Sequence, residues 1–423
     1  MKIWILLLLL IAQPSLRAAA AADLEFVPIA HRPDGETSES SLFRAADGTV
    51  YLTWIGPGGR AEERALRFAS LAPQADRWSD ARTIVSTPRL MANWADFATL
   101  AVGTDGTLWA QWYQNRPEPQ RGYDGWLARS TDDGDTWSEP APLGHEFVSL
   151  APLSGGRMLA VWLESTRLAG SISHEMHAHV ASGPPSMRLI SRLLTADGAP
   201  VQDWVIDPDV CTCCQTTLAV LSDNHVLVAY RGHTPEEIRD NHVARFDGIT
   251  WLSPEVLHDD GWHIAACPVN GPAADAAGQA AAVAWFTAAE GQARVQAKFS
   301  SDGGRSFGAA QVIDLGHPIG RLDLVSLADG SAVVSWLEGS SDDHVAGLYV
   351  RRIFPNAPPS EAVRLVDTTA ARASGFARMA TRPGASLPVV VAWTATTGQS
   401  PAGKPITSVN TGAFFAADLR AQP

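Results

Sequence analysis

Short apolar segments that end in an aromatic residue, each preceded by a polar turn, recur along the whole chain. The turns are Asp-Gly pairs or relatives such as Gly-Gly and Asp-Asn, which supply the positive φ values that tight β-hairpins require. Helical periodicity is nearly absent. The pattern occurs seven times with a mean spacing of about 56 residues, and its aromatic ends are Trp54, Trp112, Trp162, Tyr230, Trp285, Trp336 and Trp393.

A repeat of this length, built from short strands and turns, is typical of a propeller blade with four antiparallel strands. In the second repeat we expect strands over Ala98–Val102, Leu108–Tyr113 and Gly125–Ser130, and a fourth strand just after Trp137. The sequence therefore predicts an all-β fold, a β-propeller with seven blades. Six blades would result if one weak repeat were only decorative.

The last repeat ends after its third strand, near Thr407–Phe414, without an outer strand of its own. The segment Leu24–Ala30 precedes the first complete hairpin and is predicted to supply that strand. Such a closure joins the two ends of the chain and removes open sheet edges, which promote aggregation. We expect a single propeller domain over residues 23–423.

Residues 1–22 have the pattern of a secretory signal peptide. A basic start at Lys2 is followed by the apolar run Ile3–Ile11 and by small residues at Ala18–Ala22 that suit cleavage. The apolar run is shorter than the roughly 18 residues that a membrane-spanning helix needs. We therefore expect an exported, soluble protein of the periplasm or the extracellular space.

The composition fits a folded, acidic protein. Hydrophobic residues make up 46% of the chain and charged residues 18%, and the net charge is −13. We do not expect nucleic-acid binding, because the sequence has no basic stripe that could replace the counterions of phosphates. The charge equally disfavours anionic membrane surfaces, and no membrane span is expected. We expect a monomer.

Two turns have the pattern S-x-D-x-G-x-[TS]-[WF], in which Asp and hydroxyl side chains hydrogen-bond turn amides and the aromatic residue packs between sheets. Their residues are Ser130, Asp132, Gly134, Thr136 and Trp137 in one turn, and Ser300, Asp302, Gly304, Ser306 and Phe307 in the other. In phase with the repeat, these turns resemble those of the Asp-box (BNR-repeat) propellers of the sialidase superfamily. The resemblance covers nearly the whole mature chain. It implies that the turns are structural, because in that family they lie on the face away from the ligand mouth.

The resemblance also implies what a sialidase site would need. Sialidases hold the substrate carboxylate with three arginines and use a Tyr-Glu pair and an acidic Asp. Their first inner strand carries an Arg-Ile-Pro-like tripeptide, whereas two alanines follow Arg44 in this chain. Among the later tyrosines only Tyr349 has arginines beside it, at Arg351 and Arg352. We therefore expect the fold of the family here without its arginine clamp.

The loops that join strand D to strand A and strand B to strand C share one face of a propeller, where ligands bind. In this chain they contain acidic, aromatic and arginine residues suited to sugar hydroxyls or to acid–base catalysis. Loop capping, rim ion pairs and packing under loops are the structural alternatives. The candidate catalytic residues are Asp96, Glu146, Glu237, Arg239 and Asp240. The candidate ligand-binding residues are Trp94, Asp96, Arg239, Asp240, Trp262 and Asn270.

All four cysteines fall in two of these loops, at Cys211, Cys213, Cys214 and Cys267. Cys214 and Cys267 each precede a hairpin turn by about ten residues, so we expect them at similar height on neighbouring inner strands. Three interpretations remain open: disulfides in an oxidising compartment, a Cu(I) or Zn(II) site completed by His263, and a reactive thiol. A solvated strand with alternating polar faces is the favoured interpretation of the stretch that contains His177 and His179, and a metal bound by these two residues on one face is the alternative.

The leading hypothesis is an exported, sialidase-like propeller that binds a glycan or glycoconjugate at its mouth, with hydrolysis as its stronger form. The alternative is a non-catalytic periplasmic propeller that presents a Cys/His metal site or a surface for protein partners. Copper or zinc at the cysteine cluster is the cofactor that this alternative implies.

Overall fold

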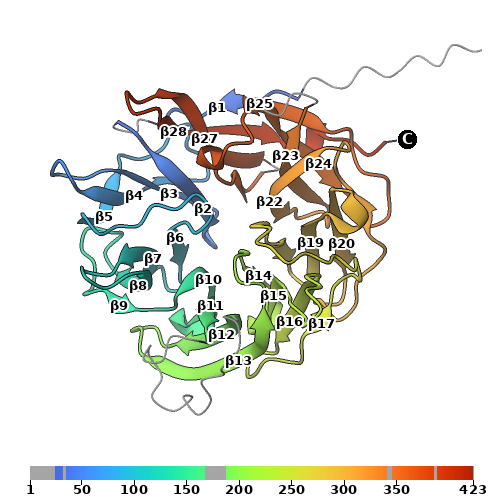
Figure 1. Ribbon diagram of the computed structural model, residues 1–423, viewed down its shortest axis with the longest axis horizontal. Coiled ribbons are helices and arrows are strands. Elements are labelled where there is room, and N and C mark those ends of the chain that lie inside the picture. Colours follow the sequence, from blue (N-terminus) through green and yellow to red (C-terminus); the bar gives the residue numbers. More distant parts are fainter. Residues whose placement is uncertain (1–23, 32–34, 167–186, 341–344, 385–387, 423) are drawn as a thin grey trace, which may run out of the picture.

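The computed structural model describes residues 24–31, 35–166, 187–340, 345–384 and 388–422. It consists of seven four-stranded antiparallel sheets arranged in a ring, in which β2, β6, β10, β14 and β22 lie nearest the centre and β1 lies at the outer rim (Figure 1). The seven-bladed propeller predicted from the repeat is confirmed, and the six-bladed alternative is wrong. We number the blades 1 to 7 in chain order.

The first four blades each consist of consecutive strands. Blade 1 comprises β2 (Ser38–Arg44), β3 (Val50–Pro57), β4 (Arg64–Leu71) and β5 (Arg82–Thr87). Blade 2 comprises β6 (Thr99–Val102), β7 (Leu108–Asn115), β8 (Tyr123–Ser130) and β9 (Ala141–Pro142). Blade 3 comprises β10 (Glu146–Pro152), β11 (Met158–Ser165), β12 (Met187–Leu194) and β13 (Pro200–Val210). Blade 4 comprises β14 (Thr217–Val220), β15 (Val226–Arg231), β16 (Asn241–Phe246) and β17 (Glu255–Val256).

The remaining blades follow the same order, except that the last one takes its outer strand from the start of the chain. Blade 5 comprises β18 (Ala273–Ala277), β19 (Ala280–Thr287), β20 (Arg294–Ser300) and β21 (Gln311–Val312). Blade 6 comprises β22 (Pro318–Ser326), β23 (Ala332–Gly339), β24 (Ala346–Ile353) and β25 (Val363–Thr368). Blade 7 comprises β26 (Arg378–Thr381), β27 (Pro388–Gln399), β28 (Pro405–Phe415) and β1 (Val27–Pro28). The helical elements of the described residues are short 3-10 turns, η1 (Ser154–Gly156), η2 (Ser222–Asn224), η3 (Ala289–Gly291), η4 (Arg372–Ser374) and η5 (Ala416–Asp418).

The second strand of each blade is the centre of the core. These strands are buried at nearly every position because neighbouring blades cover both faces of each sheet. In β7 only the last residue is exposed. The aromatic ends that define the repeat lie here: Trp112 packs against Leu66 and Phe68 of the preceding blade. Five of these tryptophans are at most 2% exposed, namely Trp54, Trp112, Trp162, Trp285 and Trp336.

The predicted closure by the start of the chain is confirmed. β1 pairs with β28, with Val27 opposite Ala413 and Pro28 opposite Gly412 (Figure 1). The Phe26 ring packs over Gly412, where an added Cβ would lie 2.4 Å from Cζ of Phe26 and would displace the ring. The ring is therefore joined by strands from opposite ends of the chain.

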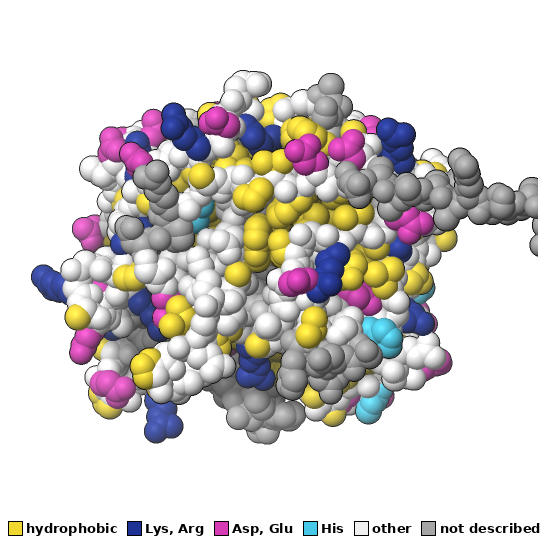
Figure 2. Space-filling model, turned by 90° about the horizontal axis from the view of Figure 1, so that it is seen from above, with side chains coloured by type: hydrophobic (Ala, Val, Ile, Leu, Met, Phe, Trp, Pro, Cys, Tyr) yellow, Lys and Arg dark blue, Asp and Glu magenta, His cyan; other side chains and the backbone are white. Residues whose placement is uncertain are grey.

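The outer edge at this closure exposes apolar side chains. Figure 2 views the edge that lies at the top of Figure 1 and shows hydrophobic side chains gathered between charged ones. Val27 is 48% exposed and Phe415 is 46% exposed. The edge strand β1 is only two residues long and ends in Pro28, which cannot donate to another strand, so further strand addition is disfavoured there.

Each of the two S-x-D-x-G-x-[TS]-[WF] turns is held by one aspartate and one serine. In the first turn, Gly134 N donates to Ser130 Oγ (2.8 Å) and Thr136 N donates to Asp132 Oδ1 (2.9 Å). The Thr136 hydroxyl donates to the second oxygen of Asp132 at 2.6 Å. The second turn repeats these bonds with Ser300, Asp302, Gly304 and Ser306.

Replacing Asp132 by asparagine is expected to lower the melting temperature at neutral pH. Hydrogen bonds from the hydroxyl and amide of Thr136 lower the pKa of Asp132 from 3.8 to about 2. This stabilisation is complete above pH 4 and is lost as the pH falls toward 2. The difference in melting temperature between wild type and D132N, followed by circular dichroism, should therefore shrink over that range. D133N is the matched control, and an equal effect of both variants would contradict the prediction.

Candidate functional site

The mouth of the propeller is marked by strained backbone. The inner strands of blades 1, 3 and 6 begin with irregular register, and each carries a non-glycine residue in the left-handed region. These residues are Glu39 (φ 59°), Phe147 (φ 52°) and Arg321 (φ 51°). Such conformations cost about 1–3 kcal/mol each and concentrate at functional sites. The strained residues lie at the face formed by the D-to-A and B-to-C loops, where the ligand site is expected.

Carboxyl and phenol groups of blades 1 to 3 meet at this mouth, and we call them the acid–tyrosine cluster (Glu39, Asp96, Tyr113, Tyr123 and Glu146). Asp96 lies in the loop before β6, and Glu146 is the first residue of β10. The Tyr123 hydroxyl lies 3.1 Å from Asp96 Oδ2 and also hydrogen-bonds Glu146. Asp96 is thus joined to Glu146 through one phenol group.

The backbone of blade 3 fixes this arrangement. The amide of Phe147, in the left-handed conformation, donates to Asp96 Oδ1 at 3.1 Å, and the amide of Val148 donates to the Tyr113 hydroxyl at 2.8 Å. Tyr113 in turn hydrogen-bonds Asp96. The register irregularity of β10 therefore directs two backbone amides into the cluster.

Burial dominates the electrostatics of the cluster. It raises the pKa of Asp96 from 3.8 to about 7, although hydrogen bonds from Tyr113, Phe147 and Tyr123 act in the opposite direction. Burial also raises the pKa of Glu146, and it raises that of Glu39 well above its ordinary value. Asp96 is only 1% exposed, whereas the Glu146 side chain is 21% exposed. Asp96 therefore holds a proton near neutral pH although it is buried, and the Tyr123 hydroxyl connects it to Glu146, which reaches solvent.

A second group at the mouth combines arginines with aromatic rings. The Trp94 ring stacks with Phe376 at 5.9 Å between centroids, and the guanidinium of Arg321 lies 4.7 Å from the Trp94 centroid. Arg372 approaches the same ring at 5.9 Å and is itself exposed. Burial and the charge of Arg372 lower the pKa of Arg321 to about 10. Trp94 is one residue removed from Ala95 and two from Asp96, so this group adjoins the acid–tyrosine cluster.

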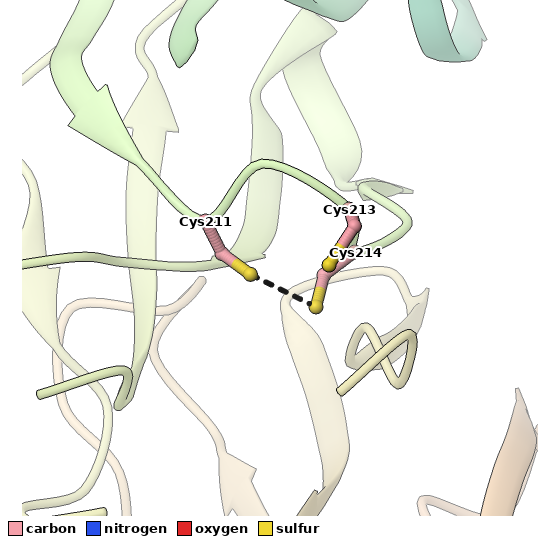
Figure 3. A group of neighbouring side chains, drawn as sticks. All are labelled: Cys211, Cys213 and Cys214. Atoms are coloured by element: carbon pink, nitrogen blue, oxygen red, sulfur yellow. Dashed lines mark hydrogen bonds between the residues drawn. The ribbon is translucent and has the colours of Figure 1, made fainter. Parts of the chain in front are cut away.

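Three cysteines converge in the turn between β13 and β14, and we call them the thiol cluster (Cys211, Cys213 and Cys214). Their sulfur atoms all lie within 4.8 Å of one another (Figure 3). Cys211 Sγ and Cys214 Sγ are 3.2 Å apart, and all four cysteines of the chain are free thiols. Hydrogen bonds from Cys213 and Cys214 lower the pKa of Cys211 well below its ordinary value.

Charged residues of the β15–β16 connection surround the thiol cluster. Arg239 Nη1 lies 3.5 Å from Cys211 Sγ, and Arg239 Nη2 donates to Glu237 at 2.7 Å. His233 bridges the carboxylates of Glu237 (3.3 Å) and Asp209 (2.9 Å). Beneath them Arg231, which is 2% exposed, donates to the carbonyl oxygens of Arg239, Asn270 and Phe286.

The side chain of Gln215, next to the thiol cluster, ties three loops together. Its Nε2 donates to Ala95 O at 2.8 Å, and its Oε1 accepts from Gly271 N at 3.0 Å. These partners belong to the loops before blades 2 and 5. The turn that carries the cysteines is therefore anchored to the residue that precedes Asp96.

The remaining predicted residues separate into different environments. Asp240 accepts from the amides of Gly261 and Trp262, which caps that loop. Trp262 is 6% exposed and packs against Phe286 and Arg231. Asn270 Oδ1 accepts from Arg321 N at 2.7 Å.

The structure does not bring all predicted thiol-site residues together. Cys267 is exposed and lies beside Thr212, with Sγ 3.7 Å from its hydroxyl, outside the group of three sulfur atoms. His263 is exposed and pairs with Ile238 in a β-bridge. The candidate residues His177 and His179 lie outside the described part of the chain.

The residues considered for a sialidase reaction lie away from the mouth. Arg44 is exposed at the far end of β2, where its Nη1 contacts Thr381 Oγ1 at 3.2 Å. Tyr349 lies within β24 and stacks on Trp336 at 5.9 Å between centroids. Tyr113 and Tyr123 lie at the mouth, where they accompany carboxyl groups rather than arginines.

Sequence reasoning missed three members of the acid–tyrosine cluster. Tyr113 follows the aromatic end of its strand, where packing is the expected role of a tyrosine, and Tyr123 and Glu39 match none of the patterns described above. Tyr113 lies near the end of β7 and Tyr123 is the first residue of β8, so two tyrosines on either side of one B-to-C connection are the signal that would have indicated the pair. Glu39 has no such signal, because its place depends on a backbone conformation.

Neither the family models nor the curated proteins contain a match to this chain. Several solved structures are similar to this chain at low sequence identity. A protein of unknown function from Dyadobacter fermentans is 16% identical with a TM-score of 0.47, and the match covers 92% of this chain and 98% of that one. The phage phi92 endosialidase is 10% identical with a TM-score of 0.49, over 93% of this chain and 69% of that one. A mutant alpha-L-arabinofuranosidase of Fusarium graminearum is 12% identical with a TM-score of 0.48, over 94% and 98%.

At these identities and TM-scores the similarity carries no inference about chemistry. The structure itself shows a seven-bladed β-propeller with titratable groups at one mouth. In the part of the chain that the structure describes, no helix has the length and apolarity needed to span a bilayer.

Proposed function

We propose that this protein is an exported propeller that binds and hydrolyses a glycan or glycoconjugate at its mouth, with Glu146 as the acid–base group. The observation that carries the proposal is the Tyr123 hydroxyl shared by buried Asp96 and partly exposed Glu146. Glycoside cleavage needs a carboxyl group that keeps its proton near neutral pH and can deliver it to the leaving oxygen.

In this proposal each member of the acid–tyrosine cluster has a separate task. Glu146 reaches solvent and donates its proton to the glycosidic oxygen, while a water molecule attacks the anomeric carbon as the C–O bond breaks and releases its own proton to bulk solvent. Asp96 holds a second proton, because burial raises its pKa to about 7, and Tyr123 passes it to Glu146 by donating its own hydrogen while accepting another. Asp96 and Tyr123 are therefore positioning and relay residues, whereas Glu146 contacts the substrate.

The arginines beside Trp94 support a substrate that carries negative charge, such as a uronic or sialic acid unit. Arg372 is exposed at the mouth, and a guanidinium binds a carboxylate through two parallel hydrogen bonds. Phe376 and Arg321 both pack against the Trp94 ring, so Trp94 helps to position Arg321 instead of stacking on a sugar.

The proposal is tested by a substrate screen on the mature protein. Fluorogenic 4-methylumbelliferyl glycosides of neutral sugars, uronic acids and sialic acid, together with a glycan array, cover the relevant chemistry. We expect binding or turnover of at least one acidic glycan. Absence of both, in protein whose circular dichroism and thermal melt show a cooperative β fold, would overturn the proposal.

A further inference from the structure

The thiol cluster contains the donor set of a soft metal ion. Three thiolates that hold an ion in one plane at about 2.3 Å place their sulfur atoms about 4 Å apart. The three sulfur atoms here already lie within 4.8 Å of one another, and one pair is at 3.2 Å (Figure 3). Small rotations of the side chains would therefore complete a trigonal site.

The backbone around the cluster is fixed on both sides. Cys211 N donates to Arg231 O at 3.0 Å, at the end of β15. On the other side Gln215, directly after Cys214, is anchored to Ala95 and Gly271. Because the loop is held at both ends, binding an ion costs little reorganisation of the chain.

The charges next to the cluster suit thiolates. Arg239 approaches Cys211 Sγ at 3.5 Å, and its orientation is set by Glu237, which His233 contacts in turn. Such outer partners orient metal-binding groups and offset their charge. Cys211 and Cys214 are buried, whereas Cys213 is partly exposed and provides a route of entry from solvent.

The number of donors decides between metals. Structural zinc is almost always held by four protein ligands in a tetrahedron, whereas Cu(I) is bound by soft sulfur ligands and accepts fewer. In the described part of the chain the group contains three sulfur atoms, while Cys267 and His263 lie outside it.

We propose that Cys211, Cys213 and Cys214 bind one Cu(I) ion as a three-sulfur site, with Arg239 as its outer, charge-compensating partner. This site is separate from the acid–tyrosine cluster and does not depend on the proposed glycan hydrolysis. It excludes Cys267 as a ligand, although that cysteine is the most accessible of the four.

The test is a Cu(I) competition titration of the reduced mature protein under anaerobic conditions, with bicinchoninate as the competing chelator. We expect one Cu(I) per chain in the wild type and an affinity lower by about 100-fold in C213S. C267S is the matched control and should retain the wild-type affinity. R239Q should weaken binding by about 10-fold.

A direct measurement complements the variants. X-ray absorption of the copper-loaded wild type should show three sulfur neighbours at about 2.3 Å, and this result does not depend on any variant folding. Wild-type affinity in C213S, an equal loss in C267S, or two or four sulfur neighbours would each overturn the proposal. Resistance of the wild-type protein to copper loading, because a Cys211–Cys214 disulfide persists under reductant, would overturn it as well.

Discussion

Replacement of Glu146 by glutamine is expected to lower the turnover number for an acidic glycoside by about 100- to 10,000-fold, the usual contribution of a positioned acid–base group. The amide keeps the size of the side chain but cannot donate or accept the catalytic proton. Substrate affinity should change little, because binding depends on the arginine side of the mouth. Initial rates at saturating fluorogenic substrate would measure the effect.

The pH profile distinguishes a proton donor from a structural residue. Burial raises the pKa of Glu146, so wild-type activity should fall as the pH rises through that raised value. Y123F should shift this limb, since it breaks the link to Asp96 while leaving Glu146 in place. E63Q is a suitable control because Glu63 lies on the rim of blade 1, where it accepts from Ser86. Activity of E146Q within a few-fold of wild type would sink the assignment.

Replacement of Asp96 by asparagine is expected to remove a loss of stability that the wild type undergoes as the pH rises to neutral. The unfolding free energy of D96N, compared with that of the wild type, should therefore be larger at pH 7 than at pH 4. The pKa of Asp96 is raised from 3.8 to about 7 by burial, so the folded state holds a proton that the unfolded chain releases. The stability that this proton confers is complete below pH 4 and is lost as the pH rises to 7. The raised pKa corresponds to a loss on the order of 4 kcal/mol across that range.

Urea unfolding at pH 4, 5.5, 7 and 8 would measure this dependence. The difference in unfolding free energy, D96N minus wild type, should increase from pH 4 to pH 7 and then stay constant. D80N, at an exposed position, should show no such trend. A constant difference for D96N across all four pH values would show that Asp96 titrates normally. A positive result would mean that the buried carboxyl is retained at the expense of stability, as expected for a functional group.

The blades could be predicted from the sequence because their signals are local. Turn pairs fix hairpins, and the burial of both sheet faces produces the apolar strands that end in tryptophan. The closure by Val27 and Pro28 followed from a strand missing at one end and present at the other. None of these predictions depended on knowing how a loop folds.

The mouth was predictable only in part. Asp96 and Glu146 each precede their hairpin turn by about ten residues, and the structure does place them together. The same counting placed Cys267 beside Cys214, but β18 begins only at Ala273 and the preceding loop carries Cys267 to the surface. The number of residues before the hairpin turn predicts the position of a side chain where the chain enters the inner strand directly. It fails to do so where a long loop precedes the strand. Glu39 shows the other limit, because a left-handed residue can direct a side chain that no periodic pattern indicates.

The side-chain amide of Gln215 connects the cysteine turn to Ala95, the neighbour of Asp96, so the thiol cluster and the acid–tyrosine cluster share a structural link. If a ligand bound at one cluster changes the affinity of the other cluster for its own ligand, thermodynamic linkage makes the effect reciprocal. Each ligand then changes the affinity for the other by the same factor. A single side chain would then let the occupancy of one site be sensed at the other.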